Sequence, residues 1–209
     1  MTDTRTVFID VTMACLQVVG VAWLFAAGYF ALRLRRPWPA RLGHFACTLL
    51  PEPWLFLLVP AVFGVLAVVP PGLWRHLRFD NPVLGGLGAA VAAVSAGLML
   101  WARWVLGRMW AGRPLVQEGH ELCTDGPYRI VRHPIYTGVV GLAAGATLAF
   151  GVGRLLLVLA VTVAVTAWRV RVEDRMMIAT FGERYRAYRR RVPALIPRGA
   201  GRSQPDPVG

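Results

Sequence analysis

The sequence predicts an all-α integral membrane protein with about five transmembrane helices, the N-terminus outside and the C-terminus in the cytoplasm. Three observations predict this fold class: the composition, a series of long apolar runs, and the distribution of arginine. The chain of 209 residues is 56% hydrophobic and has a mean hydropathy of +0.51. These values are too apolar for an ordinary soluble domain and are typical of a membrane protein.

Five apolar runs follow one another along the chain and predict the five spans. They extend approximately over Val11–Leu32, Trp54–Val69, Val83–Leu106, Pro134–Phe150 and Leu155–Trp168. The last two are short for a hydrocarbon core about 30 Å thick, so we expect them to reach into the interface or to thin the bilayer locally. The tight turn Gly151-Val152-Gly153 joins these two runs and predicts a helical hairpin.

The third run carries a small residue at every fourth position. These residues are Gly85, Ala89, Ala93 and Gly97. Positions four apart lie on one face of a helix, and small side chains there let a neighbouring helix approach closely. The spacing therefore predicts that this face packs against another span.

Arginine placement predicts the orientation, because cytoplasmic segments of membrane proteins are enriched in basic residues. All 23 basic residues are arginine, and with five spans only Arg5, Arg75, Arg78 and Arg154 fall on one side. The other side is therefore cytoplasmic. We expect a bacterial inner (plasma) membrane protein with its functional site at the cytoplasmic face.

The net charge of +12 is compatible in principle with nucleic-acid binding. The arginines flank apolar runs, however, so anionic membrane lipids are the predicted partner and nucleic acid is not. The three cysteines, Cys15, Cys47 and Cys123, are far apart and show neither metal-ligand spacing nor a disulfide framework. We accordingly expect no metal site.

Beyond the fifth run the sequence still has a helical period. Apolar residues recur at spacings of three and four, at Met177, Phe181, Tyr185, Tyr188 and Val192. With arginines off this stripe, the pattern predicts a basic amphipathic helix on the cytoplasmic interface, bent at Gly182 and ended by Pro193. Three regions result: a three-helix membrane region (1–106), a region with the chemically distinctive residues (107–197) and a disordered tail (198–209).

The most distinctive stretch runs from Gly126 to Gly138 and packs cations, tyrosines, prolines and glycines around His133. Pro134 suits the first position of a helix, which places Arg132 and His133 at its N-terminus. Free N–H groups and the helix dipole favour an anion there. A juxtamembrane loop whose arginines bind lipid phosphates is the alternative interpretation.

A second group of polar residues follows the fifth run. Arg169 and Glu173 are four apart, on one face of a helix, and an interfacial salt bridge between them is the simplest interpretation. If the last two runs form a hairpin, Glu173 also approaches His133 and Tyr136. Such a pocket would suit a zwitterionic or cationic ligand.

The spaced motifs between residues 100 and 197 resemble those of isoprenylcysteine carboxyl methyltransferases, whose wider relatives include phospholipid N-methyltransferases. The motifs are Gly126-Pro127-Tyr128, Arg132-His133-Pro134-Ile135-Tyr136, Glu173-Asp174, Phe181–Tyr188, Val192-Pro193 and Ile196-Pro197. The family often has two consecutive glutamates where this chain has Glu173-Asp174. The N-terminal half matches only as hydrophobic helices.

The resemblance implies S-adenosylmethionine as methyl donor, bound without a Rossmann domain. The implied cofactor-binding residues are His120, Glu121, Leu122, Cys123, Tyr128, His133, Pro134, Ile135, Tyr136 and Glu173. Glu173 would hold the ammonium or sulfonium end of the donor, and Arg169 would anchor an acceptor carboxylate. These two residues are the implied catalytic pair.

The implied reaction is an in-line displacement at the methyl carbon, in which the protein mainly positions and desolvates the reactants. A lipophilic carboxylate such as a prenylcysteine-like group needs no general base, whereas an amine acceptor would need Glu173 or His133 as base. Phospholipid N-methylation and thiol S-methylation are the alternatives within the family. A membrane reductase with a nicotinamide cofactor and a non-catalytic lipid-binding protein are the alternatives outside it.

Overall fold

The structure is a computed structural model that describes residues 4–33, 64, 68, 70–76, 78, 81–106 and 122–197. The elements within these ranges are helical. They are α1 (Thr4–Arg33), α4 (Pro71–Arg75), α5 (Pro82–Leu106), the 3₁₀ helix η2 (Gly126–Arg129), α6 (Pro134–Ala149), α7 (Leu155–Phe181) and α8 (Glu183–Arg191). Nearly all of the predicted second span and the predicted disordered tail lie outside the described residues.

Three of these helices are long and apolar enough to cross a membrane. They are α1, through its segment Thr4–Ala26, together with α5 and α7. Helix α6 is apolar but has 16 residues, about 24 Å at 1.5 Å per residue, and so falls short of the hydrocarbon thickness. The prediction of an all-helical membrane protein is confirmed.

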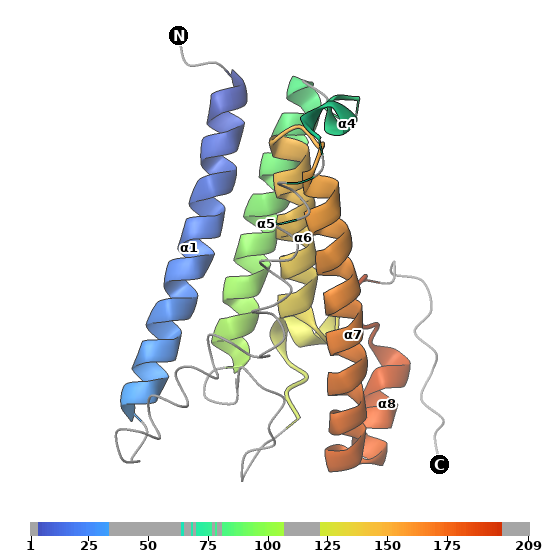
Figure 1. Cartoon of the computed structure of the whole chain (residues 1–209). Coiled ribbons are helices and arrows are strands. Elements are labelled where there is room, and N and C mark those ends of the chain that lie inside the picture. Colours follow the sequence, from blue (N-terminus) through green and yellow to red (C-terminus); the bar gives the residue numbers. More distant parts are fainter. Residues whose placement is uncertain are drawn as a thin grey trace.

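Helices α6 and α7 form the predicted hairpin. The turn between them uses positive φ at Gly151 (88°), Val152 (59°) and Gly153 (54°). In Figure 1, α6 and α7 run in opposite directions beside α5, and α1 lies on the other side of α5. The hairpin returns the chain to the level at which α6 began, and α8 folds back beside the end of α7.

Helix α7 extends beyond Trp168, where the predicted fifth span ended, and includes the first part of the predicted amphipathic helix. Helix α7 continues to Phe181, because neither glycine nor proline interrupts the sequence before Gly182. Gly182 has φ +54°, a conformation that glycine adopts at little cost, and it divides the predicted amphipathic helix into the end of α7 and the separate α8. The predicted bend at Gly182 is thus confirmed.

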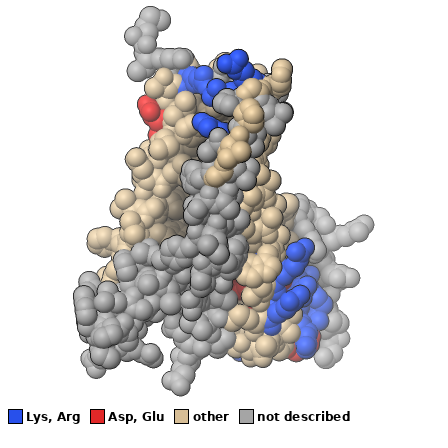
Figure 2. Space-filling view, viewed as in Figure 1, with Lys and Arg blue, Asp and Glu red and all other residues tan. Residues whose placement is uncertain are grey.

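The apolar stripe of the C-terminal region faces the protein at α8. Tyr185 and Tyr188 are 2% and 6% exposed, whereas the arginines of α8 are exposed. Figure 2 shows positive side chains at the top and at the lower right of this face, and the described surface between them is uncharged. This distribution is the one expected of a protein whose middle lies in a bilayer.

The closest helix contact joins α5 to α6, but it uses a different face of α5 from the predicted one. A Cβ added at Gly88 would lie 2.6 Å from the Gly145 carbonyl oxygen, and one at Gly145 would lie 2.8 Å from the Ala92 amide nitrogen. Gly97, by contrast, has no atom of the described residues within 4 Å of such a Cβ. On the predicted face, a Cβ added at Gly85 would lie 3.0 Å from Phe8 of α1 and Ala89 is buried, whereas Ala93 and Gly97 are exposed.

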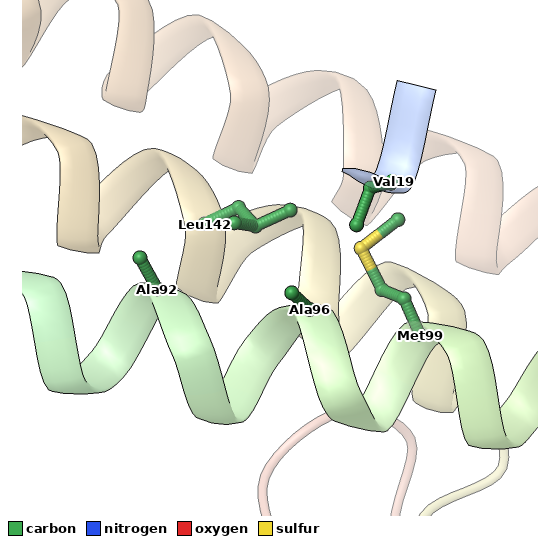
Figure 3. Close-up of a cluster of buried hydrophobic side chains, with 5 residues drawn as sticks. All are labelled: Val19, Ala92, Ala96, Met99 and Leu142. Carbon is green, nitrogen blue, oxygen red and sulfur yellow. The ribbon is translucent and has the colours of Figure 1, made fainter. Parts of the chain in front are cut away.

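A small apolar cluster fills the space where α1, α5 and α6 meet. It consists of Val19, Ala92, Ala96, Met99 and Leu142, all of them buried. In Figure 3, Met99 reaches from α5 toward Val19 of α1, and Leu142 lies above Ala92. This packing fixes the start of α6 against α5, because a Cβ at Gly138 in the first turn of α6 would lie 2.2 Å from Met99.

Candidate active site

The chemically distinctive residues gather where α6 begins. As the sequence predicts, Pro134 is the first residue of α6 and His133 is its N-cap, with φ −125° and ψ 63°. Because α7 returns antiparallel to α6, residues near position 170 on α7 lie beside the start of α6. The hairpin thereby brings Arg169, Glu173 and Asp174 to the start of α6.

His133 lies between two carboxylates from α7. Its Nε2 is 3.0 Å from Asp174 Oδ1, and its Nδ1 is 3.7 Å from Glu173 Oε2. The ring is almost buried, with 7% of the residue exposed. The predicted approach of Glu173 to His133 is confirmed, and Asp174 occupies the opposite edge of the same ring.

Asp174 is the centre of a buried charged cluster. Arg132 donates from Nη2 to Asp174 Oδ2 at 3.0 Å, and the Tyr185 hydroxyl donates to Asp174 Oδ1. Burial and the neighbouring carboxylate of Asp174 raise the pKa of Tyr185, which keeps this phenol protonated as a donor. We expected an anion near Arg132 and His133, and in the structure a carboxylate of the chain itself lies there.

The segment after α8 closes over the start of α6. Arg132 donates through Nη1 to the carbonyl oxygens of Arg189 and Val192. The backbone amides of Arg132 and His133 donate to Pro193 and Ala194, at 2.8 and 3.0 Å. These four carbonyl groups, at and just beyond the end of α8, hold the C-terminal segment against the start of α6.

Tyr136 and Arg169 form the other wall of the site. Arg169 Nε donates to the Tyr136 hydroxyl at 3.2 Å, and the rings of Tyr136 and His133 have centroids 5.8 Å apart. Glu173 Oε2 is buried between these groups and, within the described part of the chain, has no hydrogen-bond partner. A buried carboxylate oxygen without a donor costs free energy, so a ligand that brings a cation or an N–H group would be favoured here.

Tyr128 lies buried in η2, beneath α8. The Tyr188 hydroxyl donates to the Tyr128 carbonyl oxygen at 2.6 Å, which joins α8 to η2. Burial raises the pKa of both phenols, so both remain neutral. Leu122 and Cys123 precede η2 and are half-buried, and burial raises the pKa of the Cys123 thiol. His120 and Glu121 lie outside the described residues.

The cofactor-binding and catalytic residues expected from the sequence did not include Asp174, Arg132 or Tyr185. The structure shows that these three side chains meet in the buried cluster beside His133. Two signals were present in the sequence. Asp174 is a second acidic residue directly after Glu173, and Tyr185 belongs to the apolar stripe that was assigned to the membrane interface. The hairpin brings Asp174 to Arg132, and the turn at Gly182 brings Tyr185 to Asp174.

These observations define a class of protein: a helical membrane protein with a buried cluster of acids, bases and tyrosines at one end of its spans. Residues 84–184 match the phospholipid methyltransferase family. They include α5, the hairpin and the start of α8, and so cover His133, Tyr136, Arg169, Glu173 and Asp174.

Three relatives illustrate the similarity. Methanethiol S-methyltransferase 2 of Bradyrhizobium diazoefficiens is 44% identical over 98 residues, 44% of this chain and 37% of the relative. The cobalt-zinc-cadmium resistance protein CzcN of Cupriavidus metallidurans is 29% identical over 140 residues, 65% of this chain and 63% of the relative. Protein-S-isoprenylcysteine O-methyltransferase of Schizosaccharomyces pombe is 39% identical over 82 residues, 38% of this chain and 34% of the relative.

The matches thus span between 34% and 63% of the length of these relatives. The resemblance to isoprenylcysteine methyltransferases and their phospholipid relatives is confirmed. Over residues 84–184, just under half of its length, the chain is thus similar to this family of membrane methyltransferases.

Proposed function

We propose that this protein transfers a methyl group from S-adenosylmethionine to a lipophilic acceptor at the cytoplasmic end of its helices. One observation carries the proposal: Glu173 Oε2 is buried beside His133 and Tyr136, and no described residue gives it a hydrogen bond. S-Adenosylmethionine carries an ammonium and a sulfonium, and either would compensate the charge of this carboxylate. The residues therefore fit the cofactor.

The other described members of the proposed cofactor set come from the segment that precedes α6 and from the first turn of α6. The proposed set is His120, Glu121, Leu122, Cys123, Tyr128, His133, Pro134, Ile135, Tyr136 and Glu173. When bound, the cofactor supplies an activated methyl group on a positively charged sulfur. The chain would bind the positive end through Glu173 and exclude water with the rings of Tyr136 and His133, which lie 5.8 Å apart.

Arg169 would bind the acceptor. It is half-buried one helical turn before Glu173 on α7, and its Nε already bonds the Tyr136 hydroxyl. A guanidinium in this position can pair with a carboxylate while its Nε stays bonded to Tyr136. A prenylcysteine-like carboxylate is the acceptor we favour, because it is already anionic and needs no base. The proposed catalytic residues are thus Arg169 and Glu173.

A thiol is the second candidate acceptor, because Bradyrhizobium diazoefficiens has a relative named methanethiol S-methyltransferase. A thiol must lose its proton before it attacks, and His133 Nδ1 or the Glu173 carboxylate would accept that proton. A phospholipid amine would also have to transfer a proton to one of these bases. The carboxylate and thiol proposals therefore differ in whether His133 takes part in proton transfer.

Incubation of the purified protein with methyl-labelled donor and a panel of acceptors tests the function. The panel contains a prenylcysteine, a thiol, an aminophospholipid and a fatty acid, and we expect label in the prenylcysteine as a base-labile ester. Label in the thiol alone would favour the second candidate. Binding of a nicotinamide cofactor, or no saturable binding of the methyl donor, would contradict the proposal.

We propose five spans, with the site in the cytoplasm. Helices α1, α5 and α7 run in one direction and α6 in the other (Figure 1). The exposed arginines of α8 lie at the end where α1 finishes, and α4 lies at the opposite end. That placement suits a further crossing between α1 and α4, and the arginine-rich end suits the cytoplasm. In a bacterium the membrane would be the inner one, and region 107–197 would carry the methyltransferase site.

Cysteine labelling tests this orientation in a cysteine-free parent. Single cysteines replace Asp125 and Arg191, near the site, and Gly72 in α4; all three positions are exposed. We expect an impermeant maleimide to label positions 125 and 191 from the cytoplasmic side and position 72 from the opposite side. Labelling of positions 72 and 191 from one side would exclude the five-span arrangement.

A further inference from the structure

We propose that Asp174 is a positioning residue that fixes the proton of His133 on Nε2, so that Nδ1 faces Glu173 as a second hydrogen-bond acceptor. The two acceptors would together bind the primary ammonium group of the methyl donor. This inference rests on the proposed function. It assigns a role to Asp174, which the proposed catalytic and cofactor-binding residues do not include.

The first step concerns the proton. A carboxylate only accepts hydrogen bonds, and Asp174 Oδ1 lies 3.0 Å from His133 Nε2. The Nε2 atom must therefore carry hydrogen for the contact to be a hydrogen bond. In the neutral imidazole the other nitrogen, Nδ1, then keeps its lone pair.

The second step concerns the charge of the cluster. Asp174 is 7% exposed, and Arg132 Nη2 bonds its Oδ2 at 3.0 Å. This buried guanidinium balances the carboxylate, with Tyr185 as a neutral donor and the exposed Arg189 at 3.7 Å. Asp174 therefore has a charged partner besides His133, and its contact with Nε2 serves to orient the ring.

The third step concerns the ligand. His133 Nδ1 and Glu173 Oε2 are 3.7 Å apart, and Glu173 Oε2 has no donor among the described residues. Two acceptors at this distance do not satisfy each other. A primary ammonium has three N–H donors and can bond both atoms, whereas a sulfonium has none. The pair of acceptors therefore favours the ammonium group of the donor over its sulfonium group at this position.

The experiment is a nitrogen NMR spectrum of the full chain labelled with ¹⁵N-histidine, in nanodiscs at neutral pH without donor. The chain has 4 histidines, and the spectrum of His133→Gln identifies the signals of His133. We expect a neutral ring with hydrogen on Nε2. An imidazolium, or hydrogen on Nδ1, would overturn the inference whatever the variants show.

Variants separate positioning from a structural role. Asp174→Asn should mix the two tautomers of His133 and weaken donor binding about tenfold, the effect of one lost hydrogen bond. Tyr185→Phe removes a bond to the same carboxylate but keeps its charge, so it should lower the melting temperature and leave the tautomer unchanged. An unchanged tautomer in folded Asp174→Asn would contradict the proposal. Absence of donor binding by the wild type would instead contradict the proposed function, and the spectrum would still decide the role of Asp174.

Discussion

Replacement of Glu173 by glutamine is expected to weaken the binding of S-adenosylmethionine by roughly ten- to a hundredfold. The variant keeps the size of the side chain and removes its charge. A charge-assisted hydrogen bond in a partly buried site contributes about 1.5–3 kcal/mol, which corresponds to that change in affinity. Calorimetry or equilibrium dialysis with the purified protein measures it.

Glu183→Gln is the matched control. Glu183 is an exposed glutamate on α8 that pairs with Arg186 and Arg190 at 3.4 and 3.0 Å. Exposed pairs of this kind contribute little to stability, so the control should bind the donor as the wild type does. Equal losses in both variants would point to a general electrostatic effect, and an unchanged affinity in Glu173→Gln would remove Glu173 from the site.

The same experiment separates Glu173 from Arg169. Arg169→Ala should leave donor affinity near that of the wild type while it raises the Michaelis constant of the acceptor or lowers turnover. If the two residues only paired with each other, both single variants would lose stability, and reversal of both charges would restore it. Rescue of stability and activity by Arg169→Glu with Glu173→Arg would contradict the proposed roles.

The convergence of His133, Tyr136 and Glu173 was predictable because it depends on one hairpin. The turn at Gly151 and the apolar lengths on either side set which positions of α6 and α7 share a level. Asp174 was not predictable in the same way. Successive helical residues point about 100° apart, so Asp174 faces the Tyr185 side of the site while Glu173 faces the Tyr136 side. Its partner Tyr185 arrives only because α8 folds back at Gly182.

The length of α7 could not be read from hydropathy alone, and the contact face of α5 could not be read from the spacing of its small residues. Hydropathy marks where apolar residues end, but a helix continues until its backbone is interrupted, here at Gly182. On α5, small residues occupy two adjacent faces, one through Gly85 and Ala89 and the other through Gly88 and Ala92. Either face permits close approach, and the glycines of α6 determine which one is used.

Gly88→Ala should therefore destabilise the protein, whereas Gly97→Ala should not. The new Cβ at position 88 would lie 2.6 Å from two backbone atoms of α6, the Gly145 oxygen and the Ala149 nitrogen. Backbone cannot yield as a side chain does, and overpacking of this kind costs about 1–3 kcal/mol. A loss of 1 kcal/mol lowers the melting temperature of a protein this size by about 2–4 °C. At position 97 no described residue lies within 4 Å of the new Cβ, so alanine should raise helix stability by up to about 1 kcal/mol. Thermal unfolding in detergent compares the two variants, and a larger loss at position 97 would show that α5 uses its other face.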